Sequence, residues 1–233
     1  MNRKLYKRAN SNLNLVTIDT STRFAGVGVQ NQDGERAIRS WRSNQNHGRE
    51  LMPAIVESLN TVNLTPSQIS HVAVALGPGG FSAVRVGISA ALGLTVASQL
   101  PVLGVPTHVI ELEPWSSLLE NHNDVYTLLP AGRNEISWTR HSNIKKSTSG
   151  VSSPENLASI LEANSVLCGE ASELMVDHVN GENLRLTALP TREPNSLLDI
   201  SIRKFGNGEV TAYKSLRPIY ARPPSISKPN PRK

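Results

Sequence analysis

The sequence predicts a two-lobed α/β protein with mixed sheets, and three observations support this prediction. The chain has 233 residues, which is enough for two small lobes with cores of their own. Its first half contains, in order, a three-stranded meander, a helix, a strand, a helix and a strand. A weaker copy of this order follows. We expect a first lobe over residues 12–112, a smaller second lobe over 113–224, and a disordered basic tail over 225–233.

The first half gives the clearest signals of secondary structure. Apolar runs bounded by turn residues predict five strands, at 13–19, 24–30, 37–42, 71–76 and 102–105. Apolar residues at helical spacing predict one helix around residues 51–59 and another over 82–99. Pro53 lies inside the first of these, so we expect that helix to start late or to kink. Residues 65–68 have the form of a capping box and predict one short turn.

The second half is less regular. It predicts strands at 125–129, 135–140 and 165–168, and helices that start at 154 and 169 and span 195–205. A polar run with Pro114 places the boundary between the lobes within residues 111–123.

Composition excludes several classes of protein. The net charge is +5, but much of the excess lies in the two tails, which does not predict a dedicated nucleic-acid surface. Cys168 is the single cysteine, so no disulfide can form within the chain, and a reducing cytoplasm is expected. No signal peptide is visible, and the uncharged helix after Arg85 is too short and too interrupted to span a membrane.

The segment from Gly77 to Gly87 joins a strand to a helix through a glycine-rich turn. Free backbone N–H groups and the helix dipole at such a turn can bind a phosphate. The equally weighted alternative is a tight turn whose glycines supply unusual backbone angles. The turn matches neither phosphate-loop signature, because it lacks the lysine of one and the glycine spacing of the other. A phosphate site here would use Asp19, Thr20, Gly77, Gly79, Gly80, Ser82 and Arg85.

The helix after this turn carries no charge from Val86 through Gln99. Ala83, Gly87 and Ala91 lie four residues apart, so one face is nearly bare backbone. Either the helix is sandwiched in the core, or one side is covered by a partner protein. We favour the partner, because a small lobe can rarely cover every face of such a helix.

Sets of catalytic residues are not evident. The six histidines include no pair at the helical spacing of a metal site, and the chain has no CxxC motif and no GxSxG elbow. Cys168 lies in an apolar strand, which favours a buried side chain over a nucleophile. Glu135 and Glu170 are isolated carboxylates without an evident partner in the sequence. These observations argue against an enzyme that acts alone.

At this level of detail the sequence resembles a known family. The run at 77–87 is similar to the segment GPGSFTGLRIG of the TsaB (YeaZ) family, proteins of bacterial tRNA threonylcarbamoyladenosine biosynthesis. The strand and turn at 15–22, the region 47–55 and the C-terminal segment 217–222 also resemble that family. Gly80, Ser82 and Ala83 replace the usual serine, threonine and glycine of the segment, and Leu92 replaces a frequent lysine.

The resemblance implies an actin/Hsp70-like (ASKHA) fold of two ribonuclease-H-like lobes. It also implies a non-catalytic scaffold that binds a TsaD-type catalytic subunit and, through it, a TsaE-type ATPase and tRNA. Binding in the family uses the first two helices, which can also self-associate. No metal is expected, and no cofactor is expected on the isolated chain, although a nucleotide could lie at the subunit interface.

The resulting hypothesis places a partner interface on the two helices. The residues expected there are Leu51, Ile55, Leu59, Ala83, Gly87, Ala91 and Leu94. A charge at Gly87 or Ala91 is expected to abolish assembly without unfolding the chain. Two alternatives stay open, an ASKHA-type phosphotransferase or peptidase-like enzyme and a homodimeric interaction module.

Overall fold

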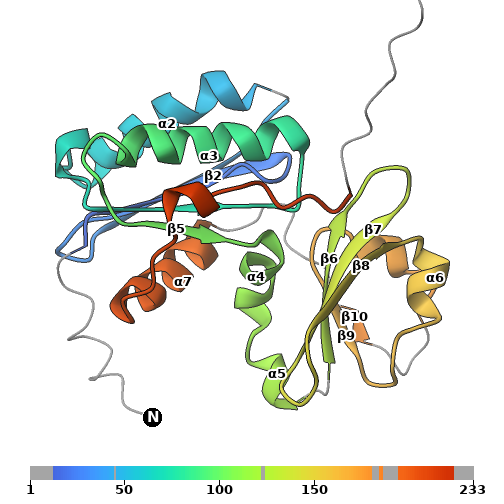
Figure 1. Ribbon diagram of the computed structural model, residues 1–233. Helices are drawn as coiled ribbons and strands as arrows, with labels where there is room; N and C mark the ends of the chain where they lie inside the picture. The colour runs from blue at the N-terminus through green and yellow to red at the C-terminus, as the bar shows by residue number, and fades with distance from the viewer. Residues whose placement is uncertain (1–12, 45, 122–123, 180–183, 186–193, 223–233) are drawn as a thin grey trace, which may run out of the picture.

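Two five-stranded mixed sheets lie next to each other in the computed structural model (Figure 1). The structure describes residues 13–44, 46–121, 124–179, 184–185 and 194–222. The tail expected over 225–233 lies outside these residues. Within the described residues no helix is long and apolar enough to cross a membrane.

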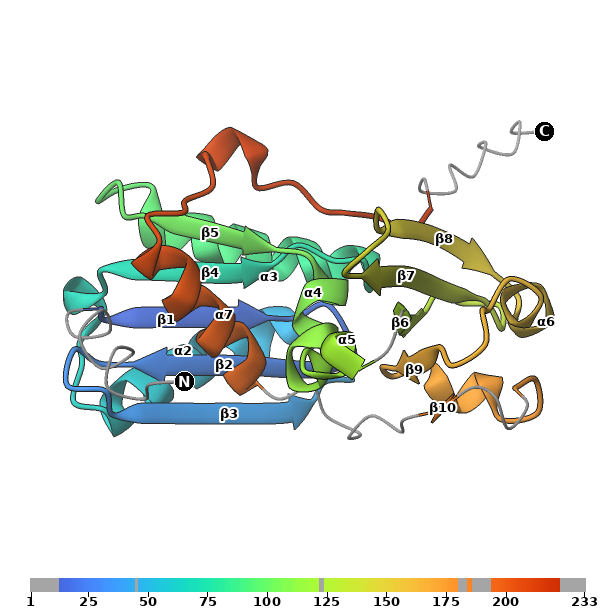
Figure 2. The same cartoon turned by 90° about the horizontal axis from the view of Figure 1, so that it is seen from below.

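The first sheet has the strand order β3-β2-β1-β4-β5 (Figure 2). Its strands are β1 (Leu15–Asp19), β2 (Phe24–Gln30), β3 (Arg36–Arg42), β4 (His71–Ala75) and β5 (Val102–Val105). The first three form the expected antiparallel meander, and β1, β4 and β5 pair in parallel. Every residue of β1 is buried, as expected for a strand covered on both faces.

Helices cover both faces of this sheet (Figure 1). On one face lie α2 (His47–Thr61) and α3 (Phe81–Thr95), with Pro53 on the exposed side of α2. On the other face lies α7 (Pro194–Gly206), whose Leu197 and Ile200 pack against Ala73 and Leu103 of the sheet. The division expected at residue 112 is therefore corrected: α7 belongs to the first lobe, because its apolar stripe fills the face of the sheet that α2 and α3 leave open.

The second sheet has the strand order β10-β9-β6-β7-β8. Its strands are β6 (Asp124–Pro130), β7 (Ile136–Ser142), β8 (Thr148–Ser152), β9 (Val166–Cys168) and β10 (Leu184–Arg185). The helix α4 (Thr107–Leu112) ends the first lobe, where it contacts α7 and also β6 of the second sheet, and the other helices near this sheet, α5 (Leu118–Asn121) and α6 (Pro154–Ala158), are short. The sequence did not predict β8, because its residues TSGVS carry no apolar alternation.

The remaining elements are single 3-10 turns. They are η1 (Pro66–Gln68), η2 (Glu113–Trp115), η3 (Ser172–Met175) and η4 (Tyr213–Ser215). The expected capping box is present at η1, where the backbone N–H of Thr65 donates to Oε1 of Gln68 at 2.8 Å. The helix expected from residue 169 is only the short turn η3.

The segment from Thr211 to Arg222 connects the lobes after α7. The backbone N–H of Thr211 donates to the carbonyl of Val102 at 2.7 Å, and that of Ile219 donates to the carbonyl of Leu76 at 2.7 Å. Arg222 then forms an ion pair with Glu135 in the second lobe. Glu135, isolated in the sequence, therefore has a partner that lies 87 residues away along the chain.

Three backbone segments meet at the glycine turn between β4 and α3. Gly77 has φ +94°, and a Cβ there would lie 2.5 Å from the carbonyl oxygen of Ile219. A Cβ on Gly79 would lie 1.9 Å from the carbonyl oxygen of Ser21. The backbone N–H of Gly80 donates to that same oxygen at 2.9 Å. Glycine is required at Gly77 and Gly79 because backbone atoms occupy the space of a side chain.

A network of imidazoles and hydroxyls, most of it buried, joins α4 to the second sheet. The hydroxyl of Thr127 lies 2.9 Å from Nδ1 of His108 and 3.0 Å from Nε2 of His141. Nε2 of His108 lies 3.1 Å from the hydroxyl of Ser137. Desolvation lowers the pKa of His141 to about 4, so this ring is neutral near pH 7.

The close packing at the glycine turn can be tested with Gly79→Ala. We expect the free energy of unfolding to fall by about 1–3 kcal/mol, because the new Cβ would overlap the Ser21 carbonyl. Gly93→Ala is the matched control, since a Cβ on Gly93 in α3 would have no atom within 4 Å, and this variant should be neutral or stabilising. Urea unfolding of both variants measures the difference, and equal stabilities would contradict the packing role of Gly79.

The partly buried His141 predicts a pH dependence of stability. Its pKa is about 4 in the folded chain and about 6.5 when unfolded, so the unfolded state binds more protons between these values. Its contribution is therefore complete above pH 6.5 and is lost as pH falls toward 4, by about 2–3 kcal/mol. Denaturant unfolding of wild type and His141→Gln from pH 7 to pH 4.5 should give a shallower slope for the variant. The pKa of His71 is also lowered by desolvation, but this residue is unchanged in both proteins, and parallel slopes would refute the assignment to His141.

Candidate functional site

The residues expected for a phosphate site gather at one place, where β1 ends and α3 begins. Asp19 closes its own turn, since its Oδ1 accepts from the backbone N–H of Ser21 at 2.9 Å and from the Ser21 hydroxyl at 2.6 Å. The hydroxyl of Thr20 donates to the carbonyl of Ala83 at 2.6 Å. The N-cap of α3 is Gly80, so the helix starts one residue before the expected Ser82, which is exposed. These contacts favour the structural interpretation of the loop.

Arg85, the expected cation of this site, contacts two aromatic rings. Its guanidinium lies 3.9 Å from the centroid of Phe81, and its Nε donates to the hydroxyl of Tyr220 at 2.9 Å. The rings of Phe81 and Tyr220 stack with centroids 4.9 Å apart. Arg85 therefore connects α3 to the C-terminal segment that crosses between the lobes. Sequence reasoning missed this cluster, because Tyr220 lies 135 residues after Arg85 and no local pattern joins them.

A small cavity lies between the lobes beside this turn. It has a volume of about 250 Å³ and is lined by Arg23, Pro78 and Gly79 from the first lobe and by Pro130 and Glu170 from the second. This volume is below the usual range of small-molecule sites, which begins at about 300 Å³.

Five of the seven residues expected at a partner interface are buried within the chain. Leu51, Ile55 and Leu59 are each 1% exposed and form the core of the first lobe under α2. The small-residue face of α3 contacts β1 and its turn: a Cβ on Gly87 would lie 2.5 Å from the Thr20 hydroxyl, and Ala91 is fully buried. Ala83 and Leu94 are only partly buried.

The expectation that a charge at Gly87 or Ala91 would spare the fold is therefore wrong. The small side chains let α3 approach its own sheet, so a glutamate at either position would enter the core. The stripes in the sequence were identified correctly, but they mark the inner faces of the helices.

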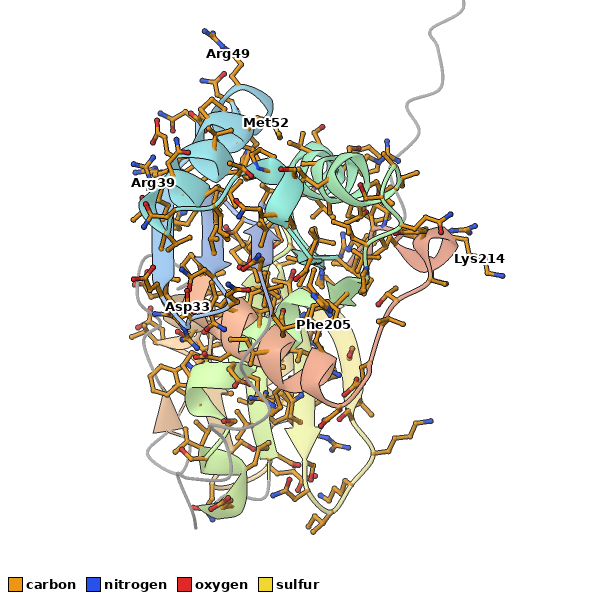
Figure 3. The ribbon with its side chains drawn as sticks, turned by 90° about the vertical axis from the view of Figure 1, so that its left-hand side faces the viewer. Asp33, Arg39, Arg49, Met52, Phe205 and Lys214 are labelled. Atoms are coloured by element: carbon orange, nitrogen blue, oxygen red, sulfur yellow. The ribbon has the colours of Figure 1, made fainter. Side chains whose placement is uncertain are left out.

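The outer faces of α2 and α3 nevertheless carry apolar side chains. Met52 and Val56 of α2 are 44% and 42% exposed, and Phe81 and Val96 at the two ends of α3 are 41% and 54% exposed. Between them, α3 presents Ser89 and Gly93 to solvent and carries no charged residue after Arg85. Figure 3 shows Arg49 and Met52 on the outer side of α2. We call this surface, made of the outer faces of α2 and α3, the helix face.

The described residues hold no cluster of histidine, cysteine or acidic side chains that could bind a metal. Cys168 is fully buried, as expected, and burial together with the nearby charge of Glu111 raises the pKa of its thiol. His47 and His108 each contact oxygen atoms of the chain itself.

Comparisons with known proteins identify relatives along most of the chain. A family model described as TsaD, tRNA N6-adenosine threonylcarbamoyltransferase, matches residues 41–163. The tRNA threonylcarbamoyladenosine biosynthesis protein TsaB of Escherichia coli is 25% identical over 223 residues, covering 90% of this chain and 95% of that protein. The tRNA N6-adenosine threonylcarbamoyltransferase of Staphylococcus saprophyticus is 33% identical over 110 residues, 47% of this chain and 28% of that enzyme.

The solved structures include a similar fold. YeaZ from Pseudomonas aeruginosa superimposes with a TM-score of 0.74 at 22% identity, covering 89% of this chain and 99% of that one. The two-lobed actin/Hsp70-like α/β fold expected from the resemblance is thereby confirmed. Sequence relatives, family model and fold agree, and the chain belongs to the TsaB (YeaZ) family.

Proposed function

We propose that this chain is a non-catalytic partner subunit of the machinery that makes threonylcarbamoyladenosine in tRNA. It binds a TsaD-type catalytic subunit and supports that subunit's activity. Family membership supports a role in this process, since the relative from Escherichia coli is described as a tRNA threonylcarbamoyladenosine biosynthesis protein. A TsaE-type ATPase and the tRNA then meet this chain only through the complex, in the cytoplasm.

The helix face is the observation that carries the proposal. Apolar side chains on the outer face of a helix lose free energy in water, and burial against a second protein removes that cost. Met52, Val56 and Val96 supply apolar area, and because each is already about half buried, its burial by a partner contributes about 1 kcal/mol. A TsaD-type subunit is a fitting partner because part of this chain is itself similar to such an enzyme.

Three features support a role without catalysis by this chain. Asp19 and Thr20 are engaged by their own turn and by α3. Arg85 packs over the ring of Phe81 and donates to the hydroxyl of Tyr220. The Cys168 thiol is buried and its pKa is raised, both of which disfavour the nucleophilic thiolate. The chain therefore acts by binding, and Cys168 offers the peptidase-like alternative no activated nucleophile.

The helix face can be tested with Val56→Glu. Val56 is 42% exposed, so the variant should fold with unchanged thermal stability, while affinity for a TsaD-type subunit from the same host falls at least tenfold. Co-purification and calorimetric titration measure the loss. Ile144→Glu is the matched control, because Ile144 is 73% exposed in the second lobe and away from the helix face. Equal binding by the two variants would overturn the assignment.

The same experiment separates the homodimer alternative. If the helix face pairs only with a second copy, Val56→Glu will convert a dimer to a monomer in size-exclusion chromatography, and no TsaD-type subunit will be captured by wild type. If wild type and Ile144→Glu capture that subunit and Val56→Glu does not, the partner role is supported.

The isolated chain should bind no nucleotide of its own. Asp19 and Thr20 already bond to groups of this chain, and the backbone N–H of Gly80 already donates to the Ser21 carbonyl, so the phosphates of a nucleotide would need donors from a second subunit. Calorimetric titration of ATP with Mg²⁺ into the purified chain is expected to give no heat of binding. Binding in the micromolar range would revive the phosphotransferase alternative.

A further inference from the structure

A second and larger cavity lies between the lobes, lined by the start of α4, by β7 and β8, and by residues 219–221. Its volume of about 580 Å³ lies within the range of small-molecule sites, about 300–1,000 Å³. It shares only Pro78 with the small cavity beside the glycine turn. It contains none of the residues that form the helix face.

One wall of this cavity is polar and already organised. The hydroxyls of Thr139 and Ser149 lie 2.9 Å apart, and Ser137 contacts His108. The Thr127 hydroxyl lies within hydrogen-bond distance of both imidazoles and of the Thr139 carbonyl, which can accept its proton. His141 uses Nε2 in this contact, and its Nδ1 has no partner among the residues that the structure describes.

The other walls are apolar and come from both lobes. Pro106 and Val109 lie on the first-lobe side, and Val151 lies on β8. None of the lining residues is Asp, Glu, Lys or Arg. Because desolvation lowers the pKa of His141 to about 4, its ring adds no charge near pH 7. A charged ligand would lose its hydration here without gaining a counter-charge.

We propose that this cavity binds an uncharged heterocyclic compound of about the size of a nucleoside, with its hydrogen-bonding edge toward His141, Thr139 and Ser149. A flat ring can contact Val109 and Val151 from the two lobes at once, which charged or fully polar ligands cannot do favourably. The hydroxyls and the imidazole can each donate or accept, so they match ring nitrogens and exocyclic amino or carbonyl groups.

The test uses the full chain with adenosine, guanosine, cytidine and uridine as probes, followed by NMR or calorimetric titration. At least one nucleoside should bind, and its 5′-monophosphate should bind at least tenfold more weakly, because the cavity offers no cation. If no nucleoside binds up to millimolar concentration, or if the monophosphate binds more tightly, the proposal is overturned.

Two variants place the binding in the cavity. Ser147 is an exposed residue at its edge, so Ser147→Trp should fill the opening and weaken binding at least tenfold, whereas Ser98→Trp, an exposed serine outside the lining, should leave it unchanged. His141→Phe keeps the ring but removes the hydrogen bond, and it should weaken binding too. Unchanged binding in Ser147→Trp would place the ligand elsewhere and refute the proposal.

This inference stands apart from the proposed function. Ser147→Trp should still capture a TsaD-type subunit, since the cavity and the helix face share no residue. Loss of nucleoside binding in Ser147→Trp with retained capture of the subunit supports both proposals. If the wild type captures the subunit but binds no nucleoside, only the proposal for the cavity is overturned. If the wild type binds a nucleoside but fails to capture the subunit, only the proposed function is overturned.

Discussion

The architecture depends on one constraint, which is that three stretches of backbone come together where no side chain fits. The turn at Gly77 to Gly79 contacts the backbone of Ser21 and of Ile219. That meeting fixes the end of β1, the start of α3 and the segment that crosses to the second lobe. The hydrogen bonds from Gly80 to Ser21 and from Ile219 to Leu76 fix the positions of these three backbone segments relative to one another.

This constraint explains why α3 has opposite properties on its two sides. Once Gly80 is fixed against the Ser21 turn, Ala83 and Gly87 must lie against Thr20. Only small residues permit that approach, and they bring Val84 and Ile88 into the core of the first lobe. The packing of the first lobe does not require the outer side of α3 to be uncharged. An outer surface that is apolar without a role in the core is the kind of surface that a partner covers.

Sequence patterns predicted the first lobe well because most of its signals are local. Strand alternation, the capping box at Thr65 and the apolar stripe of α2 each depend on residues within one turn or strand. The inner and outer sides of α2 could not be told apart, since Leu51 and Met52 differ in burial although both are apolar. Contacts such as Arg222 with Glu135, and the stacking of Phe81 on Tyr220, join distant segments and leave no pattern in the spacing.

The contacts between the lobes differ in kind from those within them. Beside the glycine turn, the segment that leaves the first lobe at Ile219 forms an ion pair between Arg222 and Glu135 of the second lobe, and the lobes enclose a cavity of about 250 Å³. At α4 and β7 they are hydrogen bonds among His108, Thr127 and His141, which hold the lobes together without filling the space next to them. His141 can accept a hydrogen bond through Nε2 only while its ring is uncharged. The desolvation that lowers the pKa of His141 to about 4, and so keeps its ring neutral near pH 7, therefore also preserves the polar wall of the larger cavity.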